Sequence, residues 1–353
     1  MTGPSLVAGP HNPATTTPPR RPGSERRTTS IDTVRPDRLH GVLVVEARGR
    51  DLGTESGERG TGEGDTSDSG HPTDARVLEE IGLTLRLDAR SHALVDIEFH
   101  PREPDGPDEP DVRPLLGATV GPGFRRQVDQ VMPAEHDRGS LLHLLLDDLV
   151  GAVLVSGYAL LHADVLPPQR GVVDAMVGRM GDRCAGWALD GGFITTLRDV
   201  GRIPTPHGPA APLLEPADDP WAWHPMATLP PGATRRRRRL DVLPPDADGL
   251  HPIDAYFRDS YRDADGNETV VHEYGVTGSV DPIDHRIVEL RADALVLPWT
   301  ECPAAIASAE RLRGTSFDDL RMRVRRDLVG TSSCTHLNDT LRSLADLGAL
   351  LHA

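Results

Sequence analysis

The sequence predicts an α+β fold of two tandem related units, each an antiparallel sheet packed with about three helices. Two observations lead to this prediction. Segments of alternating apolar residues precede segments of helical spacing, and this order occurs once in each half of the 353-residue chain. The halves also share residues in the same order, and both end on Ala-Leu-Leu-His-Ala, at 159–163 and 349–353. We therefore expect a degenerate first repeat at 26–163 and a second repeat at 235–353.

The shared residues lie at corresponding places in the two predicted units. The matches are Arg26-Arg27 with Arg235–Arg239, Asp37-Arg-Leu-His40 with Asp248-Gly-Leu-His251, Arg50-Asp51 with Arg258-Asp259, Asp88 and His92 with Asp281 and His285, and His143 with His336. One match in a chain of biased composition is uninformative, but an ordered series indicates an internal duplication.

In the first unit, alternation predicts the strands, and polar tracts predict the connections. Residues 1–25, rich in Pro, Thr and Arg, are expected to be a disordered tail. Strands are expected at 39–47, 82–87 and 93–99, mobile loops at 49–75 and 101–110, and helices from about 123 onward, chiefly at 140–161.

The second unit repeats this order of elements. Strands are expected at 253–261, 269–280 and 286–297, a turn at 263–267, and helices at 302–311, 317–328 and 334–351. The connector between the units, residues 164–234, is rich in Pro and holds Trp187, Trp221 and Trp223. Because tryptophan rings bury large apolar areas, we expect the connector to pack across both units.

Charge and composition exclude several classes of function. A formal net charge of −16 argues against a nucleic-acid surface. The chain has no lysine, which excludes Schiff-base and P-loop lysines. Its three cysteines give no disulfide framework and its first residues no signal peptide, so a cytoplasmic protein is expected. The apolar stretch 141–161 contains Asp147 and Asp148, which favours a buried helix over a membrane span.

Four residues of the second unit have side chains suited to a metal ion. His272 lies on a predicted strand, Cys302 begins one helix, and Cys334 and His336 begin another. A serine just before the last helix is positioned to cap it, and the helix dipole there is expected to lower the pKa of Cys334. Two sulfurs and two imidazoles are the ligands of a tetrahedral zinc site or of an iron–sulfur site.

Glu273 and Asp339 are candidates for a general base or for partners of the metal ligands. The competing interpretation is that Cys302 and Cys334 are small buried hydrophobic residues and that the histidines are ordinary core or surface groups. A site is favoured because the first unit lacks the set: its matching positions hold non-ligand residues, with Leu141 opposite Cys334.

The arginine run Arg235–Arg239 has two interpretations. It is suited to phosphate or coenzyme A binding, or it begins a strand and forms ion pairs with the acidic surface. The matching Arg26-Arg27 of the first unit favours the second interpretation.

Two motifs of the second unit, Thr331-Ser-Ser-Cys-Thr-His-Leu337 and Pro298-Trp-Thr-Glu-Cys-Pro303, resemble an uncharacterised bacterial domain family that ends in Cys-Thr-His-Leu. A weaker likeness connects 269–351 with the U-type iron–sulfur scaffold fold. It rests on Ala305-Ile-Ala-Ser308 after Cys302 and on Gly314-Thr-Ser316. The first ligand here is His272 rather than a cysteine, and Cys334 and His336 are not adjacent, which favours a mononuclear metal over cluster assembly.

The sequence therefore predicts a metal-dependent hydrolase or lyase that acts on a small molecule. The predicted metal is zinc or iron, with an iron–sulfur cluster as the other form, and the predicted ligands are His272, Cys302, Cys334 and His336. The alternative is a non-enzymatic iron–sulfur or sulfur-transfer accessory protein, and a third is a metal-free binding module. The connector tryptophans are expected to wall the pocket. Substrate and oligomeric state stay open.

Overall fold

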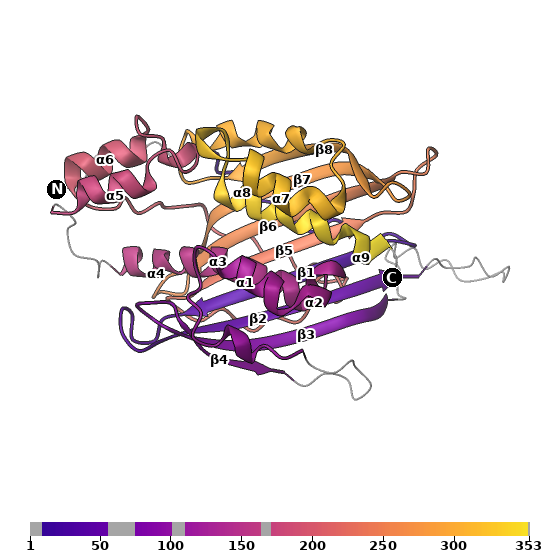
Figure 1. The fold of residues 1–353 in the computed structure, drawn as a ribbon, viewed down its shortest axis with the longest axis horizontal. Helices are drawn as coiled ribbons and strands as arrows, with labels where there is room; N and C mark the ends of the chain where they lie inside the picture. Colours follow the sequence, from indigo (N-terminus) through magenta and orange to yellow (C-terminus); the bar gives the residue numbers. More distant parts are fainter. Residues whose placement is uncertain (1–8, 56–74, 101–109, 164–170, 352–353) are drawn as a thin grey trace.

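One continuous antiparallel sheet of eight strands, in the order β4-β3-β2-β1-β5-β6-β7-β8, forms the centre of the protein (Figure 1). The computed structural model describes residues 9–55, 75–100, 110–163 and 171–351. The strands are β1 (Glu25–Val34), β2 (Val42–Thr54), β3 (Ala75–Asp88), β4 (Leu94–Phe99), β5 (Thr234–Val242), β6 (His251–Arg262), β7 (Glu268–Asp281) and β8 (Arg286–Val296). The antiparallel prediction is confirmed, but the expected pair of small sheets is a single sheet because β1 pairs with β5.

The central strands β1 and β5 are polar, so alternation did not predict them, and only the beginning of a strand at Arg235–Arg239 and at the matching Arg26-Arg27 was expected. Arginines 235 to 239 are all buried in β5. Across the ladder, Arg26 binds the Asp241 carboxylate through two hydrogen bonds of 2.6 and 2.8 Å, and Arg235 binds Asp32 at 2.7 and 2.6 Å. Buried guanidinium groups need such bidentate partners to offset the loss of hydration. Arg235, Arg236 and Arg238 therefore pair with buried carboxylates of the sheet and of the helices above it. Only Arg237 and Arg239 pair with partly exposed carboxylates, those of Glu215 and Asp254, so the expected pairing with the acidic surface holds for these two alone.

The two halves of the sheet share their backbone irregularities. A register shift follows Asp51 in the β2–β3 ladder and Asp259 in the β6–β7 ladder. The tight turns before β4 and β8 each place a histidine at positive φ, His92 at 56° and His285 at 49°. Non-glycine residues rarely adopt this conformation, so its recurrence at matched places is informative.

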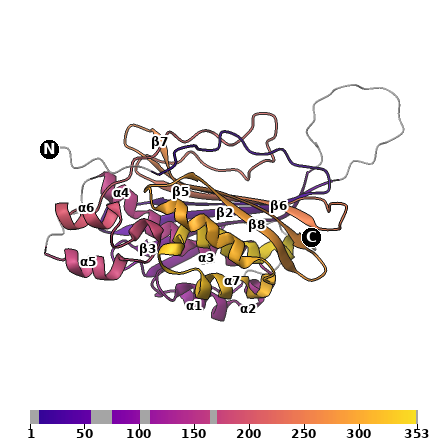
Figure 2. The same ribbon diagram turned by 90° about the horizontal axis from the view of Figure 1, so that it is seen from above.

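Helices cover one face of the sheet (Figures 1 and 2). The α-helices are α1 (Phe124–Val131), α2 (Pro133–Asp137), α3 (Leu141–Val155), α4 (Gly157–His162), α5 (Val173–Met180), α6 (Gly192–Val200), α7 (Phe317–Asp327), α8 (Thr335–Ser343) and α9 (Leu347–Leu351). The 3₁₀ helices are η1 (Arg113–Leu115), η2 (Ala185–Trp187), η3 (Cys302–Leu312), η4 (Gly330–Ser332) and η5 (Leu344–Asp346). The predicted helices at 302–311 and 317–328 are confirmed in position, whereas the one at 334–351 is divided into α8, η5 and α9.

Each half of the sheet buries its own apolar core under its helices. In the first half, α1 and α3 pack on the inward residues of β2 and β3, and in the second half η3, α7 and α8 pack on β6, β7 and β8. The segment Leu141–His162 is long and apolar enough to cross a membrane, but most of it is buried inside the protein. Its Asp147 and Asp148 form buried ion pairs with arginines, which identifies α3 as a core helix.

The opposite face of the sheet is crossed by residues 9–24 and by the later part of the connector (Figure 2). Arg20 forms a buried ion pair with Asp219 at 2.9 Å, and the indole of Trp223 donates to Thr17 at 2.8 Å. Residues 9–24 are therefore packed, contrary to the expected disorder, and residues 1–8 lie outside the described part. The expected loops at 49–75 and 101–110 fall largely outside it too, although residues 49–54 belong to β2.

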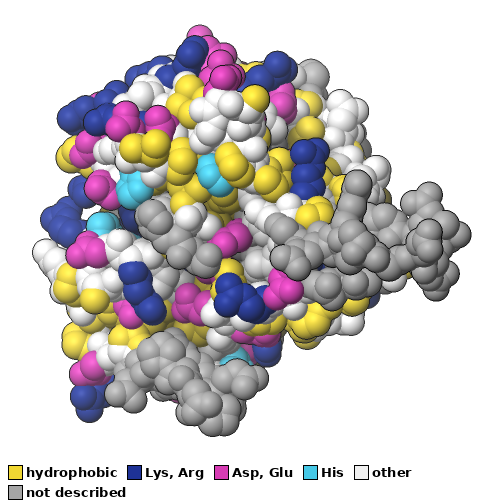
Figure 3. All heavy atoms as spheres, turned by 90° about the vertical axis from the view of Figure 1, so that its right-hand side faces the viewer, with side chains coloured by type: hydrophobic (Ala, Val, Ile, Leu, Met, Phe, Trp, Pro, Cys, Tyr) yellow, Lys and Arg dark blue, Asp and Glu magenta, His cyan; other side chains and the backbone are white. Residues whose placement is uncertain are grey.

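Acidic and basic side chains are interspersed on the face shown in Figure 3, around a central group of hydrophobic side chains. No broad area of one charge sign stands out on this face. Such mixing does not favour the long track of phosphate contacts that a nucleic-acid surface requires.

Candidate metal centre

Asp259, His272 and His336 lie together on the helical side of the second half of the sheet. Asp259 of β6 and His272 of β7 are direct neighbours across the ladder, so their side chains project from the same face. The β6–β7 register shift follows immediately after Asp259, and such irregularities re-aim side chains. His336 is the second residue of α8, whose start lies over this point of the sheet.

The two imidazole rings face a single carboxylate oxygen. His272 Nδ1 is 3.6 Å from Asp259 Oδ2, and His336 Nε2 is 3.8 Å from the same atom. The rings are stacked, with centroids 3.6 Å apart. One ligand atom from each of the three residues lies within 4.8 Å of the other two. Both nitrogens are buried and make no hydrogen bond within the described residues. Buried polar atoms without a partner are costly, so this spacing requires an explanation.

The electrostatics of the group suit a cation. Burial alone would raise the pKa of Asp259, but the Arg236 guanidinium, which binds both carboxylate oxygens at 2.9 and 3.1 Å, holds it well below its usual value. Burial lowers the pKa of His272. Burial, followed by the neighbouring His272 ring, lowers the pKa of His336 well below its usual value. The group therefore presents an ionised carboxylate and two neutral imidazoles, which are the protonation states that bind metals.

Cys334 lies beside His336, but neither Cys334 nor Cys302 is among the convergent ligand atoms of the group. The Cys334 sulfur is 3.8 Å from His336 Nδ1, and the Tyr274 hydroxyl faces it. Cys334 is itself the N-cap of α8, so the expected serine cap is wrong. Burial raises the pKa of the Cys334 thiol, and the expected lowering by the helix dipole is also wrong because desolvation of the thiolate outweighs it. Cys302 packs against Gly186 in the core of the second half.

The two predicted catalytic carboxylates lie at different places. Glu273 follows His272 on β7, so its side chain points to the opposite face, where it binds Arg258 at 3.0 Å and accepts from the backbone N–H of Ala14. The structure does not bring Glu273 to the group. Asp339 is closer, because it accepts from Arg236 at 2.9 Å and is thereby linked to Asp259.

The connector tryptophans are divided between the two faces of the sheet. Trp187 stacks on Phe193 beside η3, on the helical side, with ring centroids 5.6 Å apart. Trp221 and Trp223 lie on the opposite face, under Arg50 and Arg237. Neither of these two can wall a pocket at the metal-ligand group.

A cleft of about 690 Å³ opens beside the group, between α1 of the first half and α7 and α8 of the second. Ser333 and Thr335, which flank Cys334, line this cleft, and so does Asp339. A small molecule bound there would lie over the start of α8, whereas Asp259, His272 and His336 are not among the residues that line the cleft.

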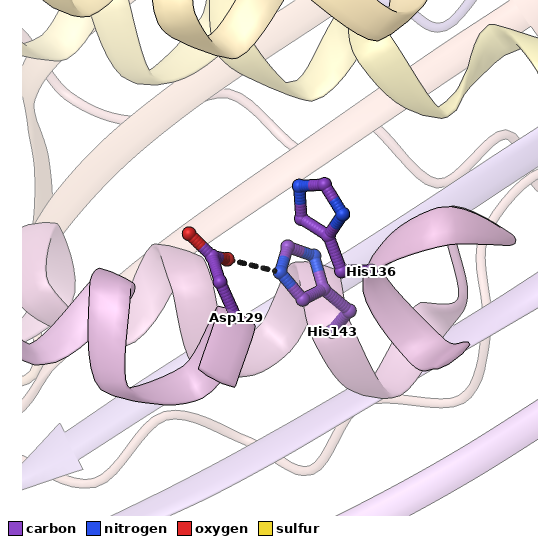
Figure 4. A group of neighbouring side chains, drawn as sticks. All are labelled: Asp129, His136 and His143. Atoms are coloured by element: carbon purple, nitrogen blue, oxygen red, sulfur yellow. Dashed lines mark hydrogen bonds and ion pairs between the residues drawn. The ribbon is translucent and has the colours of Figure 1, made fainter. Parts of the chain in front are cut away.

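A second group of the same composition lies in the first half. Asp129, His136 and His143 come from α1, α2 and α3 and converge as Figure 4 shows. His143 Nε2 is hydrogen-bonded to Asp129 at 2.9 Å, and the His136 ring meets the His143 ring edge-on, with centroids 5.1 Å apart. Asp129 and His136 line the cleft.

Sequence reasoning missed Asp259, Asp129 and His136 as members of these groups. For Asp259 a signal was present, because Arg258-Asp259 matches Arg50-Asp51 and Arg27 binds Asp51 as Arg236 binds Asp259. For the other two, the equal spacing of seven residues between Asp129, His136 and His143 was a signal, although three separate helices rather than one bring these residues together.

Comparison with known families gives one match. Residues 234–349 match the model of a family described as Protein of unknown function (DUF2889). This range is the second half of the sheet with its helices, and it contains all three residues of the candidate metal centre. A search of curated proteins and a search of solved structures each found no match, and the likeness to the iron–sulfur scaffold fold gains no support from them.

Proposed function

We propose that the protein is a cytoplasmic metal-dependent enzyme, of hydrolase or lyase type, that acts on a small molecule with zinc or iron held by Asp259, His272 and His336. One observation carries the proposal. Two buried imidazole nitrogens face one carboxylate oxygen at 3.6 and 3.8 Å, and neither has a hydrogen bond within the described residues.

These separations fit a shared metal better than direct contact. A hydrogen bond between nitrogen and oxygen spans about 2.7–3.2 Å. Two ligands of one ion, each at about 2.0–2.2 Å from it, lie about 3.4 Å apart in tetrahedral geometry. The present distances satisfy no hydrogen bond. Because the two rings are stacked, with centroids 3.6 Å apart, their lone pairs run side by side, and binding of one ion requires the rings to rotate toward a common point. Two histidines and one carboxylate are a set used by zinc and by non-haem iron.

The chain's own residues prepare this centre. Arg236 holds the Asp259 carboxylate in one orientation, and its charge is offset by Asp148 and Asp339, each at 2.9 Å. Cys334 lies 3.8 Å from His336 Nδ1, the nitrogen that does not face Asp259, and so helps to fix the orientation of the ring. A bound metal would supply Lewis-acid polarisation of a substrate carbonyl or activation of a water molecule. The adjoining cleft gives a substrate its approach.

We also propose that the two halves of the sheet arose by duplication of one unit, of which the first became a support. The strand order is the same outward from the β1–β5 junction, the register shifts at Asp51 and Asp259 correspond, and the turn histidines share positive φ. In the first half, Glu79 rather than a histidine lies opposite Asp51.

The alternative function is a non-enzymatic iron–sulfur or sulfur-transfer accessory protein. It is supported by the three cysteines, which are all free and buried. They also lie near one another, because the pKa values of Cys184 and Cys302 are raised first by burial and then by the nearby Cys334. Against it, Cys302 does not converge with the His/Asp group.

Metal analysis of protein purified without chelator tests the proposal. We expect about one zinc or iron per chain, without the visible absorbance of an iron–sulfur cluster. Such absorbance together with acid-labile sulfide would favour the accessory protein. Wild-type protein that carries no metal and binds neither added Zn²⁺ nor Fe²⁺ would refute the enzyme proposal.

A further inference from the structure

We propose that the cleft between α1, α7 and α8 binds an anionic group, a carboxylate or phosphate, through Arg126, Arg183 and Arg325. That this anion belongs to the substrate rests on the proposed function. That the cleft binds an anion rests on its own residues.

The cleft has the size of a small-molecule site and is unusually rich in arginine. Its volume of about 690 Å³ lies within the range of about 300–1,000 Å³ typical of ligand pockets. The arginines that line it are Arg125, Arg126, Arg183, Arg321, Arg325 and Arg342. The aspartates that line it are Asp129, Asp182, Asp318 and Asp339. Six cations against four anions leave the lining at +2, in a chain whose formal net charge is −16.

Three of these arginines are occupied by carboxylates. Arg125 binds Asp339 at 2.6 Å, and Arg342 binds Asp147 at 2.5 Å. Arg321 forms an ion pair with the fully buried Asp346. The pairs of Arg125 with Asp339 and of Arg342 with Asp147 connect the helices of the two halves, whereas the pair of Arg321 with Asp346 lies within the second half.

The other three arginines have no carboxylate partner within the described ranges. Arg126 projects from α1, Arg325 from α7, and Arg183 from the loop before η2. All three side chains are exposed. Within the described residues, Arg183 Nε donates a hydrogen bond to the backbone carbonyl of Arg179. Guanidinium groups that line one cleft from three different elements are suited to hold carboxylate or phosphate, whose oxygens match their paired N–H groups.

The aspartates of the lining are partly neutralised by their own partners. Asp129 is bonded to His143, and Asp339 to Arg125 and Arg236. Asp182 accepts from the backbone N–H of Leu189. Once the ion pairs are set aside, Arg126, Arg183 and Arg325 stand against Asp129, Asp182 and Asp318, so an anion would be held by direct contact with the guanidinium groups rather than by a net field.

Anion titration of the purified holo-protein at low ionic strength tests this inference. Inorganic phosphate, pyrophosphate and citrate are added separately and followed by calorimetry, so that phosphate and carboxylate are distinguished. We expect saturable binding of at least one of them. The double variant Arg126→Ala/Arg325→Ala should weaken it at least about tenfold, because two charged hydrogen-bond donors are lost. The matched control is Arg291→Ala on β8, an exposed arginine outside the cleft paired with Asp293, which should bind like wild type.

Failure of this inference is distinguishable from failure of the proposed function. No saturable binding of any of the three anions, or equal binding by the double variant and the control, would overturn the anion site. The same titration on chelator-treated protein, with metal content measured in parallel, keeps the two questions apart. Anion binding by wild-type protein that carries no metal as purified and binds neither added Zn²⁺ nor Fe²⁺ would refute the metal centre and leave the anion site standing.

Discussion

Both halves of the sheet carry an Asp/His/His group on their helical side, and the two groups differ in how their atoms are spaced. In the first half, His143 and Asp129 are 2.9 Å apart, which is a hydrogen bond. In the second half, His272 and His336 stand 3.6 and 3.8 Å from Asp259, and neither facing nitrogen is bonded within the described residues. The polar atoms of His143 and Asp129 therefore satisfy each other, whereas the two facing imidazole nitrogens of the second group have no hydrogen-bond partner within the described residues.

The difference teaches that two groups of the same residue composition can differ in whether their polar atoms are satisfied by one another. Asp129 is half-buried and its hydrogen bond with His143 stabilises the fold without an ion. Asp259 is fully buried, and burial of a carboxylate with two neutral imidazoles leaves their polar atoms without water. A metal ion at the second group would remove that cost.

The largest expected effect is loss of metal from variants of the second group. His272→Ala and His336→Ala should each reduce metal content from about one per chain to near zero, because two remaining ligands hold an ion weakly. The matched variant His136→Ala removes a histidine of the first group and should keep its metal. Elemental analysis of the three variants, purified side by side, makes the measurement. Equal metal in all three would end the comparison.

Unfolding free energy should depend more on the first group than on the second, the opposite of metal content. His143 is completely buried and hydrogen-bonded, so His143→Ala should cost about 2–4 kcal/mol of unfolding free energy, through the lost hydrogen bond and the cavity. His336→Ala, measured on chelator-treated protein, should cost less, because its side chain is 12% exposed and its Nε2 has no bond to lose. Urea denaturation of both variants measures the difference. A larger loss in His336→Ala would contradict the view of the first half as a support.

The elements that the sequence predicted well are those with an apolar period. Strands β6 and β7 and helix α7 were expected almost at their observed bounds, because alternation or helical spacing marks the side that each buries. The central strands β1 and β5 were not, because their buried residues are mostly arginine, threonine and aspartate. Their pairing depends on partners more than 200 residues away in the chain, such as Arg26 with Asp241, which no local pattern records.

The candidate site was predicted in part for the same reason. His272, Cys334 and His336 stood out as unusual side chains at element ends, and the structure brings these three together. Asp259 was recognised as a matched residue but not as a member of the group, because its role depends on lying opposite His272 in the ladder. Glu273 was chosen by adjacency to His272, and adjacent residues of a strand face opposite ways.

His224, on the opposite face of the sheet, provides a reference for how the stability of the fold depends on pH. Both ring nitrogens of His224 are bonded, to Ser30 at 2.8 Å and to Thr28 at 2.9 Å, and burial followed by Arg50 lowers its pKa to about 3. Since the unfolded chain takes up this proton near pH 6.5 and the folded one does not, stability is complete above pH 6.5. It should fall by about 1.4 kcal/mol for each pH unit from there toward pH 3.

Substitution isolates this contribution. His224→Gln keeps a hydrogen-bonding side chain that does not titrate, so its stability should decline less steeply than that of wild type between pH 6.5 and 5. Denaturation curves at three pH values, on chelator-treated protein so that metal release does not contribute, give the two slopes. Parallel slopes would show that His224 is protonated in the folded protein.

The smallest expected effect belongs to Cys302, which the sequence placed among the metal ligands. Its thiol is buried, and burial together with the nearby Cys334 raises its pKa, so it is neutral and behaves as a small apolar side chain. Cys302→Ala should therefore keep metal content unchanged and cost about 1 kcal/mol or less through a small cavity. Cys334→Ala should weaken metal affinity by about 10–100-fold, because its sulfur adjoins the His336 ring and either binds the ion or orients that ligand. Competition titrations with a chelating dye compare the two variants. Equal loss of metal from both would place Cys302 back among the ligands and would favour a centre rich in sulfur over the Asp/His/His group.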